Sequence, residues 1–228
     1  MKKILVVDDE ALLVKGIRFN LQNDGYEVIT GCDGVEAVEL AKMQNPDLIV
    51  LDVMMPRLDG LQACSKIREF SDVPIILLTA KADDMDKLLG FDRGADDYLT
   101  KPFSVTEMLA RLRVAQRRIA SLGGKTEEAV FRNGKLRIDY AAGCAYLSEK
   151  PLKLTPTEYK LLCLLAKDAG KVLTHTYLTD RIWGSSWESD MASLRVHMAT
   201  LRKKLEKDPD TQYIQTHIGI GYRMLKVE

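Results

Sequence analysis

The chain lacks the features that mark membrane-spanning, exported or disulfide-rich proteins. No apolar run approaches the ~20 residues that a membrane-spanning helix requires. The apolar run Ile4–Val7 is too short for a signal-peptide core and acidic residues follow it, so we expect no export signal. The cysteines are few, widely spaced and without a CxxC pair: Cys32, Cys64, Cys144 and Cys163. We therefore expect reduced thiols in a cytoplasmic protein with no membrane partner, rather than a disulfide framework or a zinc site.

The chain also lacks an excess of charge of either sign. Its 33 basic and 33 acidic residues give a formal net charge of zero, whereas nucleic-acid-binding proteins are usually basic. The two halves differ, however. Residues 1–119 hold 16 basic and 20 acidic residues, a net charge of −4, and residues 120–228 hold 17 and 13, a net charge of +4. Because 228 residues suffice for two domains of ordinary size, this asymmetry predicts two domains with different partners.

Short apolar segments alternate with longer amphipathic segments through the first half. The expected strands are Lys3–Val7, Tyr26–Thr30, Asp47–Leu51, Pro74–Thr79 and Asp97–Thr100. The expected helices are Ala11–Asn23, a segment through Val35 and Ala41, Asp59–Phe70, a segment through Leu88-Leu89, and Ser104–Ile119. Five such units predict an α/β domain with a five-stranded, parallel, doubly wound sheet. The working site of such a fold lies outside the carboxyl ends of the strands.

Polar residues stand at four of these strand ends. Asp8 and Asp9 end the first strand, Asp52 follows the third, Thr79 ends the fourth and Lys101 follows the fifth. Carboxylates brought this close repel one another unless a cation lies among them, and oxygen ligands of this kind suit Mg²⁺. Asp52 would then be a carboxylate nucleophile for a phosphoryl group. Any one aspartate alone could be a helix cap, but four matching strand ends favour a phosphoryl-transfer site.

The second half predicts a smaller α+β domain, residues 130–228, after a linker at residues 120–129. The linker has no periodicity and contains Gly123-Gly124. Strands are expected at Leu136–Ile138, Cys144–Leu147 and Leu152–Leu154, and the capping box Thr155–Glu158 opens a helix. Later helices are expected at Thr174–Trp183 and from about Asp190, before a hairpin of Tyr213–Thr216 and Tyr222–Leu225. This order predicts a winged helix-turn-helix domain, whose last helix enters the major groove of DNA.

The strand-end sequences resemble those of two-component receiver domains. The similar runs are Leu5–Glu10, Leu51–Gly60, Leu77–Ala80 and Asp96–Phe103. The resemblance implies that residues 1–119 form a receiver domain and that a sensor histidine kinase phosphorylates Asp52. It also implies Mg²⁺ ligation directly by Asp9 and Asp52, through water by Asp8, and by the backbone carbonyl of Met54.

The same resemblance implies further roles around the phosphorylated residue. Thr79 and Lys101 would hold the phosphoryl oxygens, and Tyr98 would be an aromatic switch that turns inward on activation. The peptide bond between Lys101 and Pro102 would be cis, a state that an X–Pro bond reaches without great cost.

Six charged residues match a dimer face in the OmpR/PhoB group of regulators: Lys87, Asp96, Asp97, Glu107, Arg111 and Arg118. The simpler interpretation is a solvated, salt-bridged face, whose exposed ion pairs would each contribute about 0–1 kcal/mol. The resemblance instead implies a homodimer that forms on activation. Lys87 would pair with Glu107, Asp97 with Arg111, and Asp96 with Arg118, each across the twofold axis, and such pairs would set specificity more than affinity.

The second half resembles the DNA-binding effector domain of the same OmpR/PhoB group. The similar runs are Leu152–Tyr159, Gly170–Thr174, Val196–Met198, Leu201–Leu205 and Gly219–Arg223. The resemblance implies a transcriptional response regulator that binds double-stranded promoter DNA, with RNA polymerase as a further partner. The Leu194-Arg195 pair, Met198 and the Gly219–Arg223 wing look most like regulators of potassium-uptake operons (KdpE-like).

The expected DNA-contacting residues are Arg195, His197, Thr200, Arg202, Lys203, Lys204 and Arg223. The first four are candidates for reading bases, and Lys203 and Lys204 for binding phosphates, which position a protein without specifying sequence. His197 could equally be a packing residue. Ile218 stands where many members carry an arginine that reaches into the minor groove, so that contact is expected to be missing and Arg223 is the remaining wing cation.

Two alternatives can be weighed from the residues. A regulator that binds DNA without phosphorylation would lack members of the acidic site, and none is missing here. A stand-alone Mg²⁺-dependent phosphatase would need a second acid two residues after Asp52, where Met54 stands. We therefore expect a phosphorylation-controlled transcription factor and not an enzyme.

Overall fold

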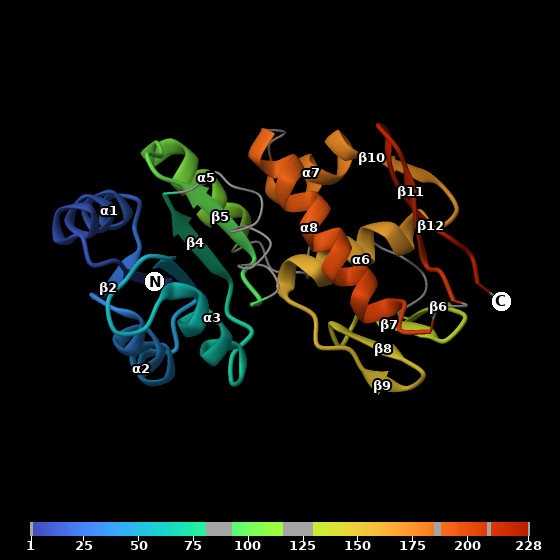
Figure 1. Ribbon diagram of the computed structural model, residues 1–228, viewed down its shortest axis with the longest axis horizontal. Helices are drawn as coiled ribbons and strands as arrows, with labels where there is room; N and C mark the ends of the chain where they lie inside the picture. The colour runs from blue at the N-terminus through green and yellow to red at the C-terminus, as the bar shows by residue number, and fades with distance from the viewer. Residues whose placement is uncertain (1, 81–92, 116–129, 185–187, 209–210, 228) are drawn as a thin grey trace. The chain divides into compact units, whose positions relative to one another are not determined.

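The computed structural model describes residues 2–80, 93–115, 130–184, 188–208 and 211–227 (Figure 1). The chain divides into two compact units, Met1–Gln116 and Arg117–Glu228. The expected linker at 120–129 and the expected helix through Leu88-Leu89 lie outside the described residues. In the ranges given above, no helix combines the length and the apolar character needed to cross a membrane.

The first unit is built on a parallel sheet with the strand order β2-β1-β3-β4-β5. Its strands are β1 (Lys3–Val7), β2 (Glu27–Gly31), β3 (Leu48–Asp52), β4 (Ile75–Thr79) and β5 (Asp97–Thr100). The side chains of β3 and β4 are buried along their whole length, as expected where helices cover both faces of a sheet. The parallel register aligns Asp52 with Leu78 and Thr79 with Thr100. The carboxyl ends of the strands therefore meet at one edge.

Helices cover both faces of this sheet, with α1 (Ala11–Asn23) and α5 (Val105–Ala115) on one face (Figure 1). The other face carries α2 (Gly34–Gln44) and α3 (Gly60–Arg68). The side chain of Asp33 caps α2 and that of Asp59 caps α3, because each accepts backbone N–H groups of the first turn. The predicted doubly wound α/β fold is confirmed.

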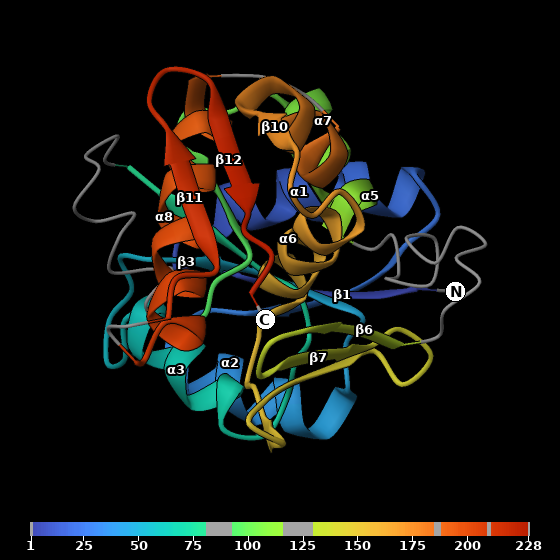
Figure 2. The same cartoon turned by 90° about the vertical axis from the view of Figure 1, so that its right-hand side faces the viewer.

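The second unit contains two antiparallel sheets. The first has the order β6 (Val130–Asn133), β7 (Leu136–Asp139), β8 (Cys144–Leu147) and β9 (Lys150–Pro151). In the second, β12 (Gly221–Met224) lies between β10 (Val172–Thr174) and β11 (Ile214–His217). The helices α6 (Pro156–Lys167), α7 (His175–Trp183) and α8 (Glu188–Leu205) complete the unit, and Figure 2 shows the β11–β12 hairpin beside α8. The predicted α+β winged-helix plan is confirmed.

The prediction of a strand at Leu152–Leu154 is wrong. The strand in this region is the two-residue β9, and Leu152 and Leu154 pack, half-buried, against the hydrophobic core instead. Strands β6 and β10 were not expected, because each is short and partly exposed and so carries little alternation in the sequence.

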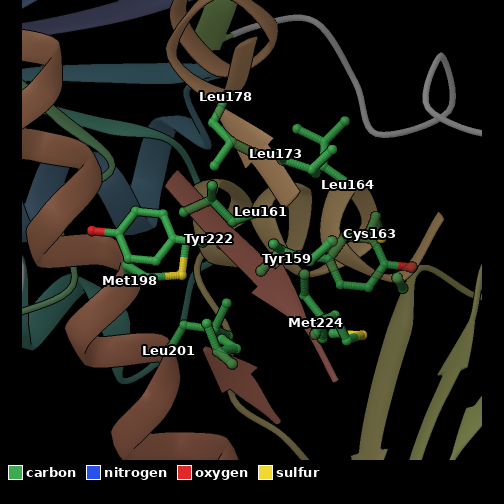
Figure 3. Packing of buried hydrophobic residues seen from close by; sticks show 14 of the residues in the cluster. Tyr159, Leu161, Cys163, Leu164, Leu173, Leu178, Met198, Leu201, Tyr222 and Met224 are labelled. Atoms are coloured by element: carbon green, nitrogen blue, oxygen red, sulfur yellow. The ribbon is translucent and has the colours of Figure 1, made fainter. Parts of the chain in front are cut away.

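The core of the second unit surrounds α6, whose residues Thr157–Ala166 are all buried. Figure 3 shows the side chains that meet there, from α6, α7, α8, β10 and β12. Helix α8 contributes the apolar stripe expected from the sequence, with Leu194, Met198, Leu201 and Leu205 buried. The predicted capping box is also present, because Thr155 and Glu158 bond reciprocally at the start of α6.

Candidate functional site

The carboxyl ends of β1 and β3 bring three aspartates together. Asp8 and Asp52 are buried, with exposed fractions of 1% and 3%, and Asp9 is exposed. One carboxylate oxygen from each of the three lies within 4.8 Å of the other two. Like charges at this separation repel one another, so the cluster requires a compensating cation.

The ammonium group of Lys101 supplies such a charge. Its Nζ lies 2.7 Å from Asp8 Oδ2 and 2.8 Å from Asp52 Oδ1, with Glu10 Oε1 at 3.4 Å. The backbone N–H of Lys101 donates to the carbonyl of Thr79 at 2.7 Å, which holds the loop after β5 against the end of β4. The Lys101–Pro102 bond is cis, as the resemblance implied.

Backbone N–H groups fix the orientation of the two buried carboxylates. Met54 donates to Asp52 Oδ2 at 2.9 Å, and Glu10 donates to Asp8 Oδ1 at 2.8 Å. The loop after β3 turns back tightly, since a Cβ at Gly60 would lie 2.0 Å from the carbonyl oxygen of Asp52. Only glycine fits at this approach, so the sequence of the loop itself determines where Asp52 stands.

The environment changes the acidity of the central pair. Burial raises the pKa of the Asp52 carboxyl above its ordinary value, and the charge of Asp8 acts in the same direction, against the hydrogen bond from Lys101. Burial alone would lower the pKa of Lys101, but its hydrogen bonds with Asp52 and Asp8 raise it well above the usual range. Lys101 therefore stays protonated, and an additional cation would stabilise the negative charge on Asp52.

Three further expected residues lie at this edge. Thr79 is the last residue of β4 and is buried, with an exposed fraction of 7%. Tyr98 lies on β5, aligned with Leu77 of β4, and is also buried at 4%. Met54 is the second residue of the loop after β3, and its side chain is exposed. The structure thus brings the predicted strand-end residues together, while the roles of Tyr98 as a switch and of the Met54 carbonyl stay predictions.

A cavity of about 310 Å³ opens beside the aspartates. It is lined by Asp8 and Asp9, by Lys15 and Arg18 of α1, and by Glu36 of α2, among others. The sequence reasoning missed the two basic residues and Glu10. Lys15 and Arg18 stand three positions apart on α1, which places them on the same side of the helix, and this spacing was the available signal.

The residues of the expected dimer face are already paired within the chain where the structure describes them. Arg111 Nη1 lies 2.8 Å and 3.1 Å from the two carboxylate oxygens of Asp97, and both residues are buried at 3%. Arg111 also contacts Glu107, at 3.3 Å. Asp96 pairs with Arg68, at 2.7 Å, and accepts the backbone N–H of Ile75. Lys87 and Arg118 lie outside the described residues, so the pairing of this face across a dimer stays a prediction.

The expected DNA-contacting residues of α8 divide into an outer and an inner group. Arg195 and Lys203 are exposed, whereas His197 and Thr200 are buried, at 1% and 5%. The ring of His197 lies 5.9 Å from that of Trp183, and the Thr200 hydroxyl donates within the helix, 3.0 Å from the His197 carbonyl. The expectation that His197 and Thr200 face DNA is therefore corrected. They extend the buried side of α8, and the packing alternative holds for His197.

Three other cations of this surface bond to neighbouring elements, two from α8 and one from β12. Arg202 Nη2 donates to Thr216 Oγ1 of β11, at 2.6 Å, and Lys204 Nζ lies 2.5 Å from Glu158 Oε2 of α6. Arg223 of β12 donates to Gln215 of β11. The turn of the β11–β12 hairpin carries Ile218, whose side chain is 94% exposed. The surface thus presents two exposed cations on α8 beside an apolar wing.

Comparisons with known proteins cover both units. Residues 4–113 match the family of response regulator receiver domains, and residues 149–224 match the family described as "Transcriptional regulatory protein, C terminal". The chain is 42% identical, over 231 residues, to the alkaline phosphatase synthesis transcriptional regulatory protein PhoP of Bacillus subtilis (strain 168). That alignment covers 98% of this chain and 96% of the relative.

Solved structures of full-length proteins are similar to this chain over both units. A RitR mutant has a TM-score of 0.77 at 28% identity, with coverage of 98% of this chain and 99% of that chain. The response regulator DrrB, an OmpR/PhoB homologue from Thermotoga maritima, has a TM-score of 0.51 at 33% identity and covers 99% of each chain. The narrower expectation of a KdpE-like regulator stays a prediction. With both halves matched and in the same order, the chain belongs to the OmpR/PhoB family of two-component response regulators.

Proposed function

We propose that this response regulator is switched by Mg²⁺-dependent phosphorylation of Asp52 by a sensor histidine kinase, and that the phosphorylated chain dimerises on promoter DNA. The observation that carries the proposal is the buried Asp52 carboxylate, in contact with Lys101 and beside two further aspartates. RNA polymerase is a further partner under this proposal. We also propose that the receiver domain ends at residue 119 and that the DNA-binding domain begins at residue 130.

The acidic cluster has the donor set that Mg²⁺ prefers. Its carboxylate oxygens lie within 4.8 Å of one another, and hard oxygen ligands of this kind bind Mg²⁺ together with waters and phosphate oxygens. Asp9 and Asp52 would bind the ion directly, Asp8 through water, and Met54 through its carbonyl. When bound, Mg²⁺ supplies positive charge for the oxygens of the transferring phosphoryl group.

The residues of the chain position and stabilise the transfer. An Asp52 carboxylate oxygen attacks the phosphorus of the kinase phosphohistidine, a P–O bond forms, and the P–N bond breaks with its electron pair going to the imidazole. Lys101, 2.8 Å from Asp52, would pair with the new phosphoryl oxygens. The hydroxyl of Thr79, at the end of β4, would donate to them. Thr79 and Tyr98 would then move toward the phosphoryl group. Because the phosphoryl group interacts more favourably with this rearranged conformation, phosphorylation would shift the equilibrium toward the conformation that dimerises.

Activation by a phosphate mimic tests the proposal on the full chain. Beryllium fluoride with Mg²⁺ is expected to convert monomers to dimers, measured by analytical ultracentrifugation, and to tighten binding to DNA fragments selected by the treated protein. Beryllium fluoride without Mg²⁺ is the matched control and should leave both measurements unchanged. A dimer fraction and a DNA affinity that do not respond to the mimic would contradict the switch.

The wing offers a second, independent prediction. Ile218→Arg is expected to strengthen DNA binding, because the exposed position would gain a cation for the phosphate backbone or the minor groove. Each added phosphate contact steepens the dependence of log Kd on log salt concentration by about 0.9. Fluorescence anisotropy at a series of salt concentrations measures this slope. Lys153→Arg, also an exposed site of the second unit, is the control and should leave the slope unchanged. An unchanged slope in Ile218→Arg would show that the wing does not approach DNA.

A further inference from the structure

His175 occupies the junction between α7 and the wing. It is the first residue of α7, and its backbone N–H donates to the carbonyl of Ile220 at 3.0 Å. Its ring packs edge-on against the ring of Tyr222 in β12, with centroids 5.4 Å apart and an interplanar angle of 70°. The side chain is half-buried, so one part of the ring is fixed by the wing while another part reaches solvent.

Among the described residues, Arg195 is the charged side chain that acts on His175. Helix α8 contributes the exposed Arg195, and β12 contributes Tyr222, whose ring also lies 5.8 Å from the Arg202 guanidinium. His217 of β11 is aligned with Gly221, next to Tyr222. Burial lowers the pKa of His175, and the charge of Arg195 acts in the same direction. The free protein therefore holds His175 neutral near pH 7.

An anion bound at this junction would reverse that balance. A DNA phosphate beside Arg195 would offset the repulsion and give a protonated imidazole a charge-assisted hydrogen bond. The exposed side of α8, with Arg195 and Lys203, already favours a polyanion as the partner of this surface. His175 thus lies where a phosphate would favour its charged form.

We propose that His175 and Arg195 together bind the phosphate backbone of DNA, and that His175 takes up one proton from solvent when it does so. The proposal rests on the proposed function, since it assumes that this surface binds DNA. Binding that takes up a proton becomes tighter as pH falls. The increase begins below the pKa of His175 in the complex and is complete below its lower pKa in the free protein.

Binding of a mixed-sequence DNA duplex by the full-length chain tests the proposal, because phosphate contacts do not depend on base sequence. Between about pH 8 and pH 5.5 the parent is expected to bind roughly tenfold more tightly, which corresponds to a pKa shift of about one unit at one site. His175→Gln should bind with a nearly constant affinity, equal to that of the parent at high pH. His175→Arg should bind tightly at every pH.

His217→Gln is the matched control, because it removes another half-buried histidine of the same unit. It should keep the pH dependence of the parent. A pH dependence that arises in the acidic residues of the first unit would remain in both His217→Gln and His175→Gln. Calorimetry in buffers of different ionisation enthalpy gives a second measurement. The parent should take up close to one proton per chain, and His175→Gln close to none.

Two results would overturn the proposal. The first is a His175→Gln variant that keeps the pH dependence and the proton uptake of the parent. The second, which also holds if that variant does not fold, is an NMR titration of the parent in which the His175 pKa does not rise when the duplex is added. If the parent binds no duplex at any pH, the proposed DNA-binding function fails, and this inference fails with it. If binding is tight but independent of pH, the inference alone fails.

Discussion

An Asp52→Asn variant is expected to accept no phosphoryl group and to lose the whole of the phosphorylation-dependent gain in dimerisation and DNA binding. The asparagine amide is a poor nucleophile and cannot form the acyl phosphate. Mass spectrometry after incubation with acetyl phosphate and Mg²⁺ measures the loss, and analytical ultracentrifugation measures the oligomeric state.

The loss in Asp52→Asn should not come from unfolding. The pKa of Asp52 is raised in the folded protein, mainly by burial, so the ionised form costs folding free energy at neutral pH and a neutral amide removes that cost. We expect the variant to melt at a temperature no lower than that of the parent. Asp59→Asn is the matched control, because Asp59 caps α3 and asparagine also caps helices. Phosphorylation of Asp52→Asn at the level of the control would exclude Asp52 as the phosphoacceptor.

An Arg111→Ala variant is expected to destabilise the first unit by about 3–5 kcal/mol, because it leaves the buried carboxylate of Asp97 without its bidentate partner. Urea unfolding followed by circular dichroism reports both units. Tryptophan fluorescence reports the second unit alone, since Trp183 and Trp187 both lie there. The change should therefore be seen by circular dichroism and not by fluorescence.

Arg113→Ala is the control on the same helix. Arg113 pairs with Asp24 at 2.8 Å, but its side chain is 59% exposed, and such pairs contribute about 0–1 kcal/mol. If the two variants unfold at the same urea concentration, the Asp97–Arg111 pair is not the buried anchor that its geometry indicates. A large difference means that any exchange of this pair across a dimer must replace it with an equally desolvated contact.

The strand-end site was predictable from the sequence because a parallel sheet fixes where its residues go. Apolar runs as short as those of β3 and β4, alternating with amphipathic segments, are typical of buried parallel strands, and the carboxyl ends of such strands share an edge. The position of Asp52 relative to Lys101 follows from this topology alone. The contact between the Lys101 ammonium group and Asp8 could not be predicted in this way, because it depends on the rotamer of a long side chain.

Complementary charges in the sequence do not show whether an ion pair forms within one chain or between two chains. Asp97 and Arg111 match an intermolecular pair as sequence, yet they lie within one unit at 2.8 Å. The inner residues of α8 were misassigned for a related reason. His197 and Thr200 are polar, so the pattern placed them outside, but the Thr200 hydroxyl is satisfied by a carbonyl one turn earlier, at Val196, and needs no solvent.

The attachment of α8 to its neighbours has a thermodynamic consequence. Glu158 closes the capping box of α6 and also accepts Lys204 of α8, while Arg202 joins α8 to β11. The helix that carries Arg195 is thus held at its far end by an adjacent helix and by the wing before any ligand arrives. Docking of such a preorganised surface incurs little loss of side-chain and backbone entropy. Discrimination between DNA sequences would then depend on how well the duplex adapts to a rigid protein, rather than on folding of the protein around the duplex.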